Sequence, residues 1–262
     1  MKVENKNKYV IYTALFGDYD DLIDPVGVDY KCDFICFTDQ KNIISKKWKV
    51  IYVDTQQNSV LKNREYKFLP HKFLNTYQVS MYIDANIKIL NDPYYFIERY
   101  SNSYGICVPK HFERECIYDE ITQCVNLNKI SKEEGNVIFD ILKADNYPSK
   151  NGLGENNIII RRHMEPEIVL LMESWWETFR KGAKRDQLTL LYLAWKNNIP
   201  VYLMDETSRN KNKYFRYNLH KGDKKLPFLK RTFLYVKANR FRSSFFDSIC
   251  NIHELITKVT SR

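Results

Sequence analysis

The chain has 262 residues, of which 44% are hydrophobic and 15% aromatic, a composition that supports a large core and argues against a disordered chain. No apolar run reaches the ~18 residues of a membrane-spanning helix, and the first residues lead into a strand without the apolar segment of a signal peptide. The six cysteines are scattered without CxxC pairs, which indicates reduced core thiols and a cytoplasmic protein.

The formal charge of +9 is unevenly distributed along the chain. Residues 208–262 hold 14 Lys and Arg against three acids, a net of +11, whereas the residues before them have a net charge of −2. Aromatic and aliphatic residues interleave with these cations. Such a segment suits an anionic membrane surface or a nucleic-acid backbone. It equally suits a C-terminal helix packed on the domain with a solvated basic face.

The first predicted strand, residues 9–15, is an apolar run typical of a central strand and ends at a loop of Gly and Asp, residues 16–21. Ligands bind beyond the carboxyl ends of strands in open α/β sheets, so we expect this loop to form a ligand wall. An aromatic side chain could stack on a base, and the backbone could read its edge. The residues concerned are Thr13, Ala14, Phe16 and Tyr19. The aspartates of the loop fit a second metal site, and equally turn and helix-capping chemistry.

Two further buried strands are predicted at residues 32–39 and 48–54. Residues 61–77 then carry a broad apolar stripe at helical spacing, with basic residues at the more polar positions. Pro70 lies inside this segment and should end or kink a helix, so we expect two pieces. We expect the helical segment to place its basic side chains, Arg64, Lys67 and Lys72, near the carboxylates at the ends of the strands.

A strand of alternating character at residues 79–83 ends in Asp84, and Asn86 follows. A carboxylate at the end of a buried strand is costly to desolvate without a helix N-terminus, a cation or a metal ion beside it. Asp-x-Asn offers two hard oxygen ligands to Mg²⁺ or Mn²⁺. Taken alone, however, the tripeptide is better explained as a polar turn between two strands.

Further along, a strand is predicted at residues 158–160 and amphipathic helices at 164–180 and 186–197. We expect three tryptophans of these helices to lie in the core. They are Trp175, Trp176 and Trp195.

Several motifs in this order resemble the GT-A nucleotide-sugar glycosyltransferases. They lie at residues 12–19, 34–39, 64–67, 82–86, 111–120, 156–161 and 185–188. More narrowly, they resemble a glycosyltransferase-like family once catalogued as a domain of unknown function. That family includes plant mucilage and pectin-related enzymes and bacterial polysaccharide-locus proteins, and is related to the glycogenin and lipopolysaccharide galactosyltransferase family.

The resemblance implies an α/β fold of GT-A type over residues 8–220, with a central mixed, mostly parallel sheet flanked by helices. A basic, aromatic-rich helical segment over residues 221–262 would follow this domain.

The resemblance also implies roles for single residues. Asp84 and Asn86 match the family's Asp-x-Asp, which chelates a divalent ion bridging the two phosphates of the donor. Asn86 replaces a carboxylate, so metal binding should be weaker or need a further ligand. His220 resembles a late histidine that completes the metal site, and Lys67 a lysine that contacts the donor. Asp186 matches a catalytic aspartate near the reacting sugar, although it would also serve as the N-cap or first-turn carboxylate of a helix.

We expect the middle of the chain to bind the acceptor. A polar cluster follows a predicted strand at residues 105–109, and at helical spacing His111, Arg114 and Tyr118 share a face. These side chains could hydrogen-bond sugar hydroxyls or an anionic group of the acceptor. They would equally suit a surface helix with internal salt bridges. Asn157 lies in a loop that could close over the sugar.

The function implied by the resemblance is transfer of a sugar from a nucleotide sugar, expected to be a UDP-sugar, to a glycan or lipid-linked saccharide in surface polysaccharide assembly. Mn²⁺ or Mg²⁺ at Asp84, with Lys67 and Arg64, would stabilise the departing nucleoside diphosphate. The role of Asp186 decides between inversion and retention, and kinship with the glycogenin-like family favours retention. The protein would act in the cytoplasm or on the inner face of the membrane.

Two other functions stay open. The basic tail could bind nucleic acid, although the aspartate-rich strand ends of the main domain argue against this partner. Asn86 in place of a carboxylate also fits a non-catalytic scaffold, because fold alone does not fix function.

Overall fold

The computed structural model describes residues 8–29, 31–182 and 185–260. Residues 1–7, which carry the expectation that no signal peptide is present, and residues 261–262 of the predicted tail lie outside this part. Of the described helices, none combines the length and apolar character needed to cross a membrane.

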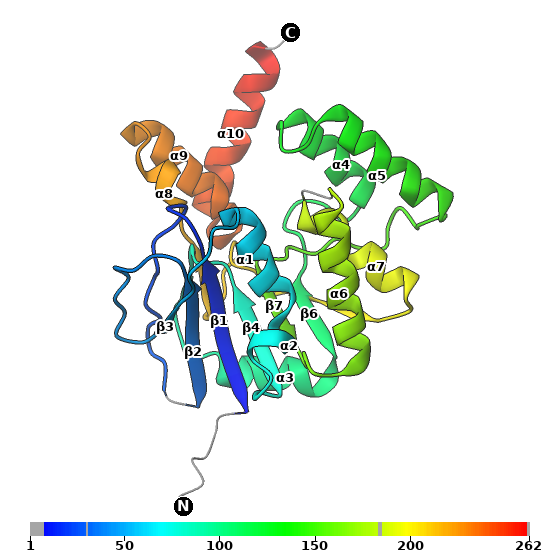
Figure 1. Cartoon of the computed structure of the whole chain (residues 1–262). Coiled ribbons are helices and arrows are strands. Elements are labelled where there is room, and N and C mark those ends of the chain that lie inside the picture. The colour runs from blue at the N-terminus through cyan, green and yellow to red at the C-terminus, as the bar shows by residue number, and fades with distance from the viewer. Residues whose placement is uncertain (1–7, 30, 183–184, 261–262) are drawn as a thin grey trace, which may run out of the picture.

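A seven-stranded sheet forms the centre of the molecule, in the order β3-β2-β1-β4-β7-β6-β8 (Figure 1). Its strands are β1 (Tyr9–Leu15), β2 (Cys32–Thr38), β3 (Lys49–Tyr52), β4 (Val79–Ile83), β6 (Ile106–Pro109), β7 (Ile158–Arg161) and β8 (Val201–Met204). Among these strands β7 alone runs antiparallel to its neighbours. A separate antiparallel pair joins β5 (Ile87–Ile89) to β9 (Phe215–Tyr217). The predicted α/β fold with a mixed, mostly parallel sheet is therefore confirmed.

Helices cover the sheet and extend above it in Figure 1. They are α1 (Ser59–Phe68), α2 (Pro70–Phe73), α3 (Tyr94–Ser103), α4 (Ile117–Asn126), α5 (Lys132–Ala144), α6 (Pro166–Arg180), α7 (Leu190–Lys196), α8 (Lys221–Lys224), α9 (Phe228–Ala238) and α10 (Ser244–Thr260). Two 3₁₀ turns lie at Asp186–Leu188 and Arg240–Arg242. Helices α8 to α10 lie above the carboxyl ends of the parallel strands.

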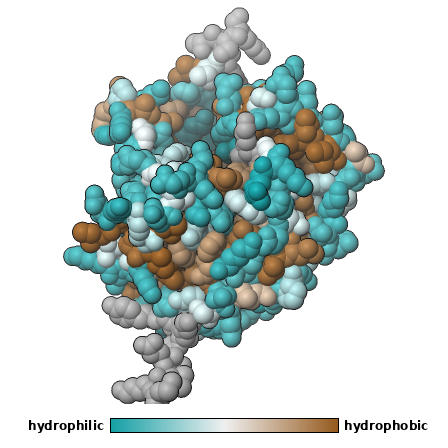
Figure 2. All heavy atoms as spheres, viewed as in Figure 1, coloured by the Kyte–Doolittle hydropathy of each residue, from teal (hydrophilic) through white to brown (hydrophobic). Residues whose placement is uncertain are grey.

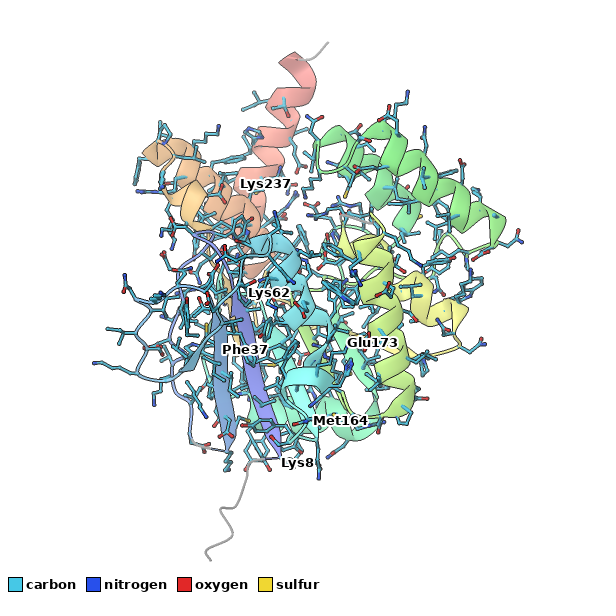
Figure 3. All side chains as sticks on the ribbon, in the orientation of Figure 1. Lys8, Phe37, Lys62, Met164, Glu173 and Lys237 are labelled. Carbon is cyan, nitrogen blue, oxygen red and sulfur yellow. The ribbon has the colours of Figure 1, made fainter. Side chains whose placement is uncertain are left out.

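Alternate residues of each strand divide the core into two layers. Val10 and Tyr12 of β1 face the layer shared with α1 and α6, whereas Tyr9 and Ile11 face the layer shared with α3. On the first face, the Phe37 ring of β2 lies 4.5 Å from the Tyr66 ring of α1 (Figure 3).

The predicted tryptophan core is confirmed in part. Trp175 and Trp176 are buried, and the Trp175 ring stacks on Phe68 with 3.7 Å between centroids. Trp195 is only partly buried and packs against Tyr147.

Several predicted boundaries hold and others do not. The break at Pro70 is confirmed, because α1 ends at Phe68 and α2 begins at the proline. The helix predicted from residue 186 instead begins as a 3₁₀ turn, in which Asp186 is the first-turn carboxylate and Arg185 holds the N-cap position. Helix α5 was not predicted, although its capping box of Ser131 and Glu134 is a sequence-level signal of a helix start.

All six cysteines are free thiols, and all but the half-buried Cys116 are buried. Burial raises the pKa of Cys32, Cys36 and Cys107 to about 12, so these thiols are unreactive at neutral pH. The prediction that the cysteines lie in the core is confirmed for all of them except Cys116.

The C-terminal segment is helical over its described residues and is docked on the domain. Asn239 is fully buried and donates to the Tyr217 carbonyl at 3.2 Å, while Arg242 donates to the Phe215 carbonyl at 2.7 Å. Hydrophobic and hydrophilic side chains alternate over α8 and α9 in Figure 2.

Candidate active site

A buried lysine joins two carboxylates at the carboxyl end of β4. Lys67 Nζ donates to Asp186 Oδ2 at 2.8 Å and lies 3.7 Å from Asp84 Oδ1. Arg64 Nε lies 3.5 Å from the same Asp186 oxygen. The fold therefore brings together α1, the end of β4 and the 3₁₀ turn at residues 186–188, as the sequence prediction required.

Local structure positions the two cations. Asn58 caps α1 by accepting from the Val60 and Leu61 amides, and spacing of three residues then places Arg64 and Lys67 on one face. The carbonyl of Lys67 accepts from the Tyr12 hydroxyl at 3.1 Å and from Arg161 at 2.5 Å. These buried contacts fix the end of α1 against the sheet.

Asp186 is a buried, ionised carboxylate. Burial acts to raise its pKa, but the charges of Lys67 and Arg64 hold that pKa below its ordinary value. Its backbone carbonyl accepts from Asn156 Nδ2 at 3.1 Å and from Trp175 Nε1 at 3.3 Å. A carboxylate with a low pKa is a poor proton acceptor near neutral pH, so the geometry favours charge stabilisation over general base catalysis.

Asp84 lies at the edge of this cluster, with 34% of its side chain exposed. It accepts from the Tyr82 hydroxyl at 2.8 Å, and its backbone amide donates to the Asn157 carbonyl at 2.9 Å. Asn86 is buried, and its Nδ2 donates to the Asn218 carbonyl at 2.9 Å. The partly exposed carboxylate is thus the more accessible of the two predicted metal ligands, while the side-chain oxygen of Asn86 is not used in its bond to Asn218.

His220 faces the same region. Its Nδ1 lies 2.9 Å from Asp20 Oδ2. Burial acts to lower its pKa, but the hydrogen bond to Asp20 and the charges of Asp20, Asp84 and Asp223 hold that pKa above its ordinary value. His220 is therefore close enough to Asp84 to be affected by its charge, and its role as a metal ligand stays a prediction.

The donor atoms at the end of β4 fit a divalent ion completed by substrate. Within the described ranges, no group of three or more His, Cys, Asp or Glu side chains is arranged to hold a metal by itself. The Asp84 carboxylate and the Asn86 amide oxygen are nevertheless hard ligands, and Mg²⁺ commonly combines one or two carboxylates with substrate phosphates. The set suits such a shared ion rather than a metal centre made by protein alone.

The aspartates after β1 are explained by α8 and its neighbours rather than by a second metal ion. Asp18 pairs with Lys221, and Asp21 pairs with Lys224 at 2.7 Å. Asp20 accepts from His220 Nδ1 at 2.9 Å and from the Lys221 amide at 3.2 Å. These contacts tie the loop to the start of the C-terminal segment.

The residues expected to contact the donor base divide into buried and accessible ones. Thr13 and Ala14 lie in the buried strand β1, and Phe16 is only 3% exposed, with its ring 5.4 Å from Tyr66. Tyr19 is 64% exposed, and its ring lies 4.9 Å from His220. Tyr19 is therefore the aromatic residue of this loop available for stacking.

The predicted acceptor residues do not share a helical face. Residues 111–116 form a loop before α4, in which His111 Nδ1 accepts from the Arg114 amide at 3.1 Å. Arg114 Nε donates to the buried Glu120 at 2.5 Å, and Tyr118 points to the Tyr147 carbonyl at 2.9 Å. The spacing argument failed because the chain wraps around the His111 ring instead of continuing the helix backwards.

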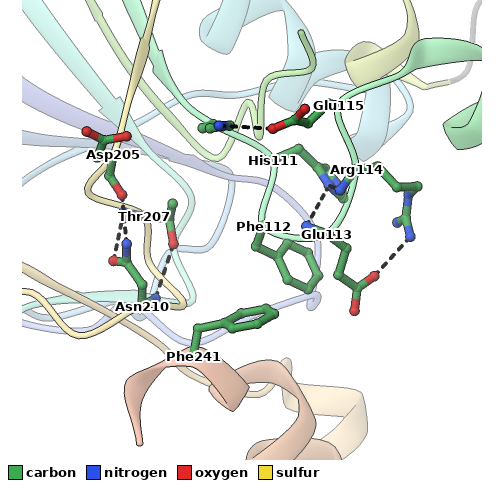
Figure 4. A pocket seen from close by; sticks show the side chains of 10 residues that line it. His111, Phe112, Glu113, Arg114, Glu115, Asp205, Thr207, Asn210 and Phe241 are labelled. Carbon is green, nitrogen blue, oxygen red and sulfur yellow. Dashed lines mark hydrogen bonds and ion pairs between the residues drawn. The ribbon is translucent and has the colours of Figure 1, made fainter. Parts of the chain in front are cut away.

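Asn157 lies beside Asp84 and away from this loop. Its Nδ2 donates to Ser208 Oγ at 3.1 Å, while its Oδ1 is buried without a hydrogen-bond partner. His111 and Arg114 instead line a pocket of about 420 Å³. Figure 4 shows it between two loops and Phe241.

Sequence reasoning missed a buried ion pair next to this pocket. Arg209 Nε donates to Glu155 Oε1 at 2.6 Å, and its guanidinium lies 4.4 Å from the Phe112 ring centroid and 4.2 Å from that of Tyr217. Burial raises the pKa of Glu155, and the charge of Arg209 acts against this rise. The two residues lie 54 positions apart, so no local sequence pattern predicts that they pair.

Comparison with known proteins identifies a family. Residues 1–216 match the sequence model described as TOD1/MUCI70, glycosyltransferase-like domain. This match confirms the predicted resemblance. No curated protein matches the sequence.

Two solved structures are similar at low sequence identity. The apo form of mouse xyloside xylosyltransferase 1 aligns with a TM-score of 0.43 and 8% identity, over 78% of this chain and 87% of that chain. The apo structure of the bifunctional glycosyltransferase WbbM aligns with a TM-score of 0.46 and 9% identity, over 92% of this chain but only 46% of that chain. Both likenesses are too distant to assign a substrate or a residue.

Proposed function

The chain belongs to the TOD1/MUCI70 glycosyltransferase-like family, and from this premise we propose that it transfers a sugar from a nucleotide-sugar donor, a UDP-sugar, to a glycan or lipid-linked saccharide during surface polysaccharide assembly. The observation that carries the proposal is the bridge of Lys67 between Asp84 and Asp186. Sugar transfer leaves a nucleoside diphosphate, and fixed cations beside a partly exposed carboxylate are suited to stabilise that leaving group.

The diphosphate would lie beside Asp84. Asp84 and Asn86 would hold Mn²⁺ or Mg²⁺ together with the phosphates, and His220 is the candidate further ligand through Nε2, because Asp20 occupies Nδ1. The bound ion would neutralise negative charge on the leaving group. Lys67 and Arg64 add positive charge from the protein side, and Tyr19 would stack on the base.

Asp186 would act by holding Lys67 and Arg64 in place and by opposing positive charge on the reacting sugar. Its low pKa makes it unsuited to take the proton of the acceptor hydroxyl. A reaction with retention needs no such protein base, since the departing phosphate can accept this proton. We therefore favour retention.

The test is thermal unfolding of the purified chain with UDP-, GDP-, CMP- and dTDP-sugars, each with and without Mn²⁺. A ligand at ~100 times its dissociation constant adds about 2.7 kcal/mol to stability. We expect a Mn²⁺-dependent rise in Tm with UDP-sugars that is lost in Asp84→Ala. The absence of a shift with every donor would sink the proposal, and donor binding without transfer to any acceptor would favour the scaffold alternative.

We also propose that the C-terminal helices rest on an anionic membrane, at the inner face of the cell membrane. The supporting observation is a set of exposed apolar side chains beside many cations. This set consists of Phe228, Leu229, Phe245, Ile252, Leu255 and Ile256. Residues 221–262 contain ten Lys and Arg against three acids, which suits anionic lipid.

Flotation with vesicles distinguishes the partners of this surface. We expect salt-sensitive binding to vesicles containing phosphatidylglycerol, no binding to phosphatidylcholine vesicles, and loss of binding when Phe245 and Ile252 are both changed to Ser. Tight RNA binding with no vesicle binding would contradict the membrane proposal and favour a nucleic-acid partner.

A further inference from the structure

The pocket of about 420 Å³ lies outside the Lys67 cluster. Its wall comes from the loop after β6, the loop after β8 and the 3₁₀ turn that follows α9 (Figure 4). The lining residues are Lys110, His111, Phe112, Glu113, Arg114, Glu115, Asp205, Thr207, Asn210 and Phe241. This volume falls within the range of small-molecule sites.

The cations of the pocket are already neutralised by protein carboxylates. Lys110 Nζ lies 3.1 Å from Glu115, and Arg114 is paired with Glu113 at 2.9 Å and with Glu120 at 2.5 Å. His111 is uncharged at neutral pH, because burial lowers its pKa to about 4. Lys110 and Arg114 are both paired with carboxylates, so the pocket offers an anion no unpaired cation among these residues. The pocket is therefore unsuited to a phosphate or a uronic acid.

Two aromatic rings give the pocket an apolar side. The centroids of Phe112 and Phe241 lie 6.1 Å apart, and Phe241 is 42% exposed. In Figure 4 the Phe241 ring lies between the Phe112 ring and the side chains of Thr207 and Asn210. A few polar groups around an aromatic face suit a pyranose ring, since its C–H groups pack on the ring while carboxylates and amides accept its hydroxyls.

Arg209 connects this pocket to the candidate active site. Its guanidinium lies between the Phe112 and Tyr217 rings and pairs with the buried Glu155. The Tyr217 ring in turn lies 6.0 Å from the ring of His220. Contacts between side chains therefore link Phe112 of the pocket, through Arg209 and Tyr217, to His220 beside the candidate active site.

We propose that this pocket binds an uncharged sugar unit of the acceptor, remote from the hydroxyl that is glycosylated. The inference rests on the proposed glycosyltransferase function and specifies its acceptor class. It also gives the C-terminal segment a part in the site, because Phe241 follows α9 directly.

The test is saturation-transfer NMR with four probes: the methyl glycosides of glucose, galactose, N-acetylglucosamine and glucuronic acid. We expect signals from neutral glycosides and none from the glucuronide. Phe241→Ala should weaken neutral binding about tenfold, and Phe241→Tyr should restore it. Phe139→Ala is the matched control, because Phe139 of α5 is a phenylalanine of similar exposure that lies outside the pocket, and it should leave binding unchanged.

The UDP-induced rise in Tm is measured on the same samples, so that the two proposals can fail separately. Neutral binding that survives Phe241→Ala, equal binding of the glucuronide, or no glycoside signal in a protein that binds UDP would each overturn the pocket proposal. Absence of UDP binding would instead overturn the proposed function. Arg114→Ala is unsuited to this test, because it leaves the buried Glu120 without its cation.

Discussion

Replacing Lys67 with methionine removes a buried cation while keeping most of the side-chain volume. Of the two described cations that pair with Asp186, only Arg64 would remain, at 3.5 Å instead of the 2.8 Å contact that Lys67 makes. Removing one partner of a buried ion pair costs about 3–5 kcal/mol, because the remaining charge is desolvated without compensation. We expect Lys67→Met to lower the free energy of unfolding by an amount in this range.

The assay is urea unfolding followed by tryptophan fluorescence, which reports on the buried Trp175 beside Asp186. Lys72→Met is the matched control, because Lys72 is 46% exposed and pairs with Glu173 at 2.8 Å. An exposed pair contributes only about 0–1 kcal/mol. The double variant Lys67→Met, Asp186→Asn removes both charges and should recover part of the lost stability.

The dependence on pH supplies an independent readout. The folded-state pKa of Asp186 is depressed, so its contribution is present above the unfolded pKa of about 3.9 and is lost as pH falls through the folded value. Lys67→Met should shrink this acid sensitivity. The reasoning is refuted if Lys67→Met costs no more than Lys72→Met, or if the double variant is as unstable as the sum of its single changes.

Three further predictions concern neighbouring groups. The folded-state pKa of His220 is raised, so its stabilising contribution is present below the unfolded pKa of about 6.5 and is lost as pH rises through the folded value. His220→Gln should remove this loss of Tm above the unfolded pKa, and an unchanged profile would contradict the prediction. Asp84→Asn should abolish the Mn²⁺-dependent UDP shift while changing the ligand-free Tm little, because the carboxylate is partly exposed; a retained shift argues against this ligand. Asn239→Leu removes the hydrogen bond from the buried Asn239 to the Tyr217 carbonyl and should lower the free energy of unfolding by about 1–3 kcal/mol. It should also speed proteolysis of the C-terminal helices, and resistance equal to that of the wild type would show that other contacts hold them.

Local sequence was sufficient for the elements whose signals are short-range. The alternation at residues 79–83 predicted β4 with Asp84 at its end, and Pro70 predicted the break between α1 and α2. Both signals act within a few residues, through the period of a strand and through the ring of proline. The capping box of Ser131 and Glu134 is also a short-range signal, and it marks the start of α5, which the sequence analysis did not predict.

Local spacing failed where tertiary contacts redirect the chain. His111, Arg114 and Tyr118 have the spacing of a helix face, but the segment before α4 folds around the buried His111 ring. Phe16 has the composition of a stacking residue in a ligand loop, yet it packs into the core on Tyr66. In each case burial of a ring outweighed the local pattern.

Strand periodicity, helix signals and the order of the motifs can be read along the chain, so they were enough to predict the kind of fold and the residue types of the site. The pairing of the charges could not be predicted in this way. Lys67 and Asp186 lie 119 positions apart, and Arg209 and Glu155 lie 54 apart. Their pairing depends on the order of strands in the sheet and on how helices pack against it, since a buried charge is stable only where the whole fold supplies its partner.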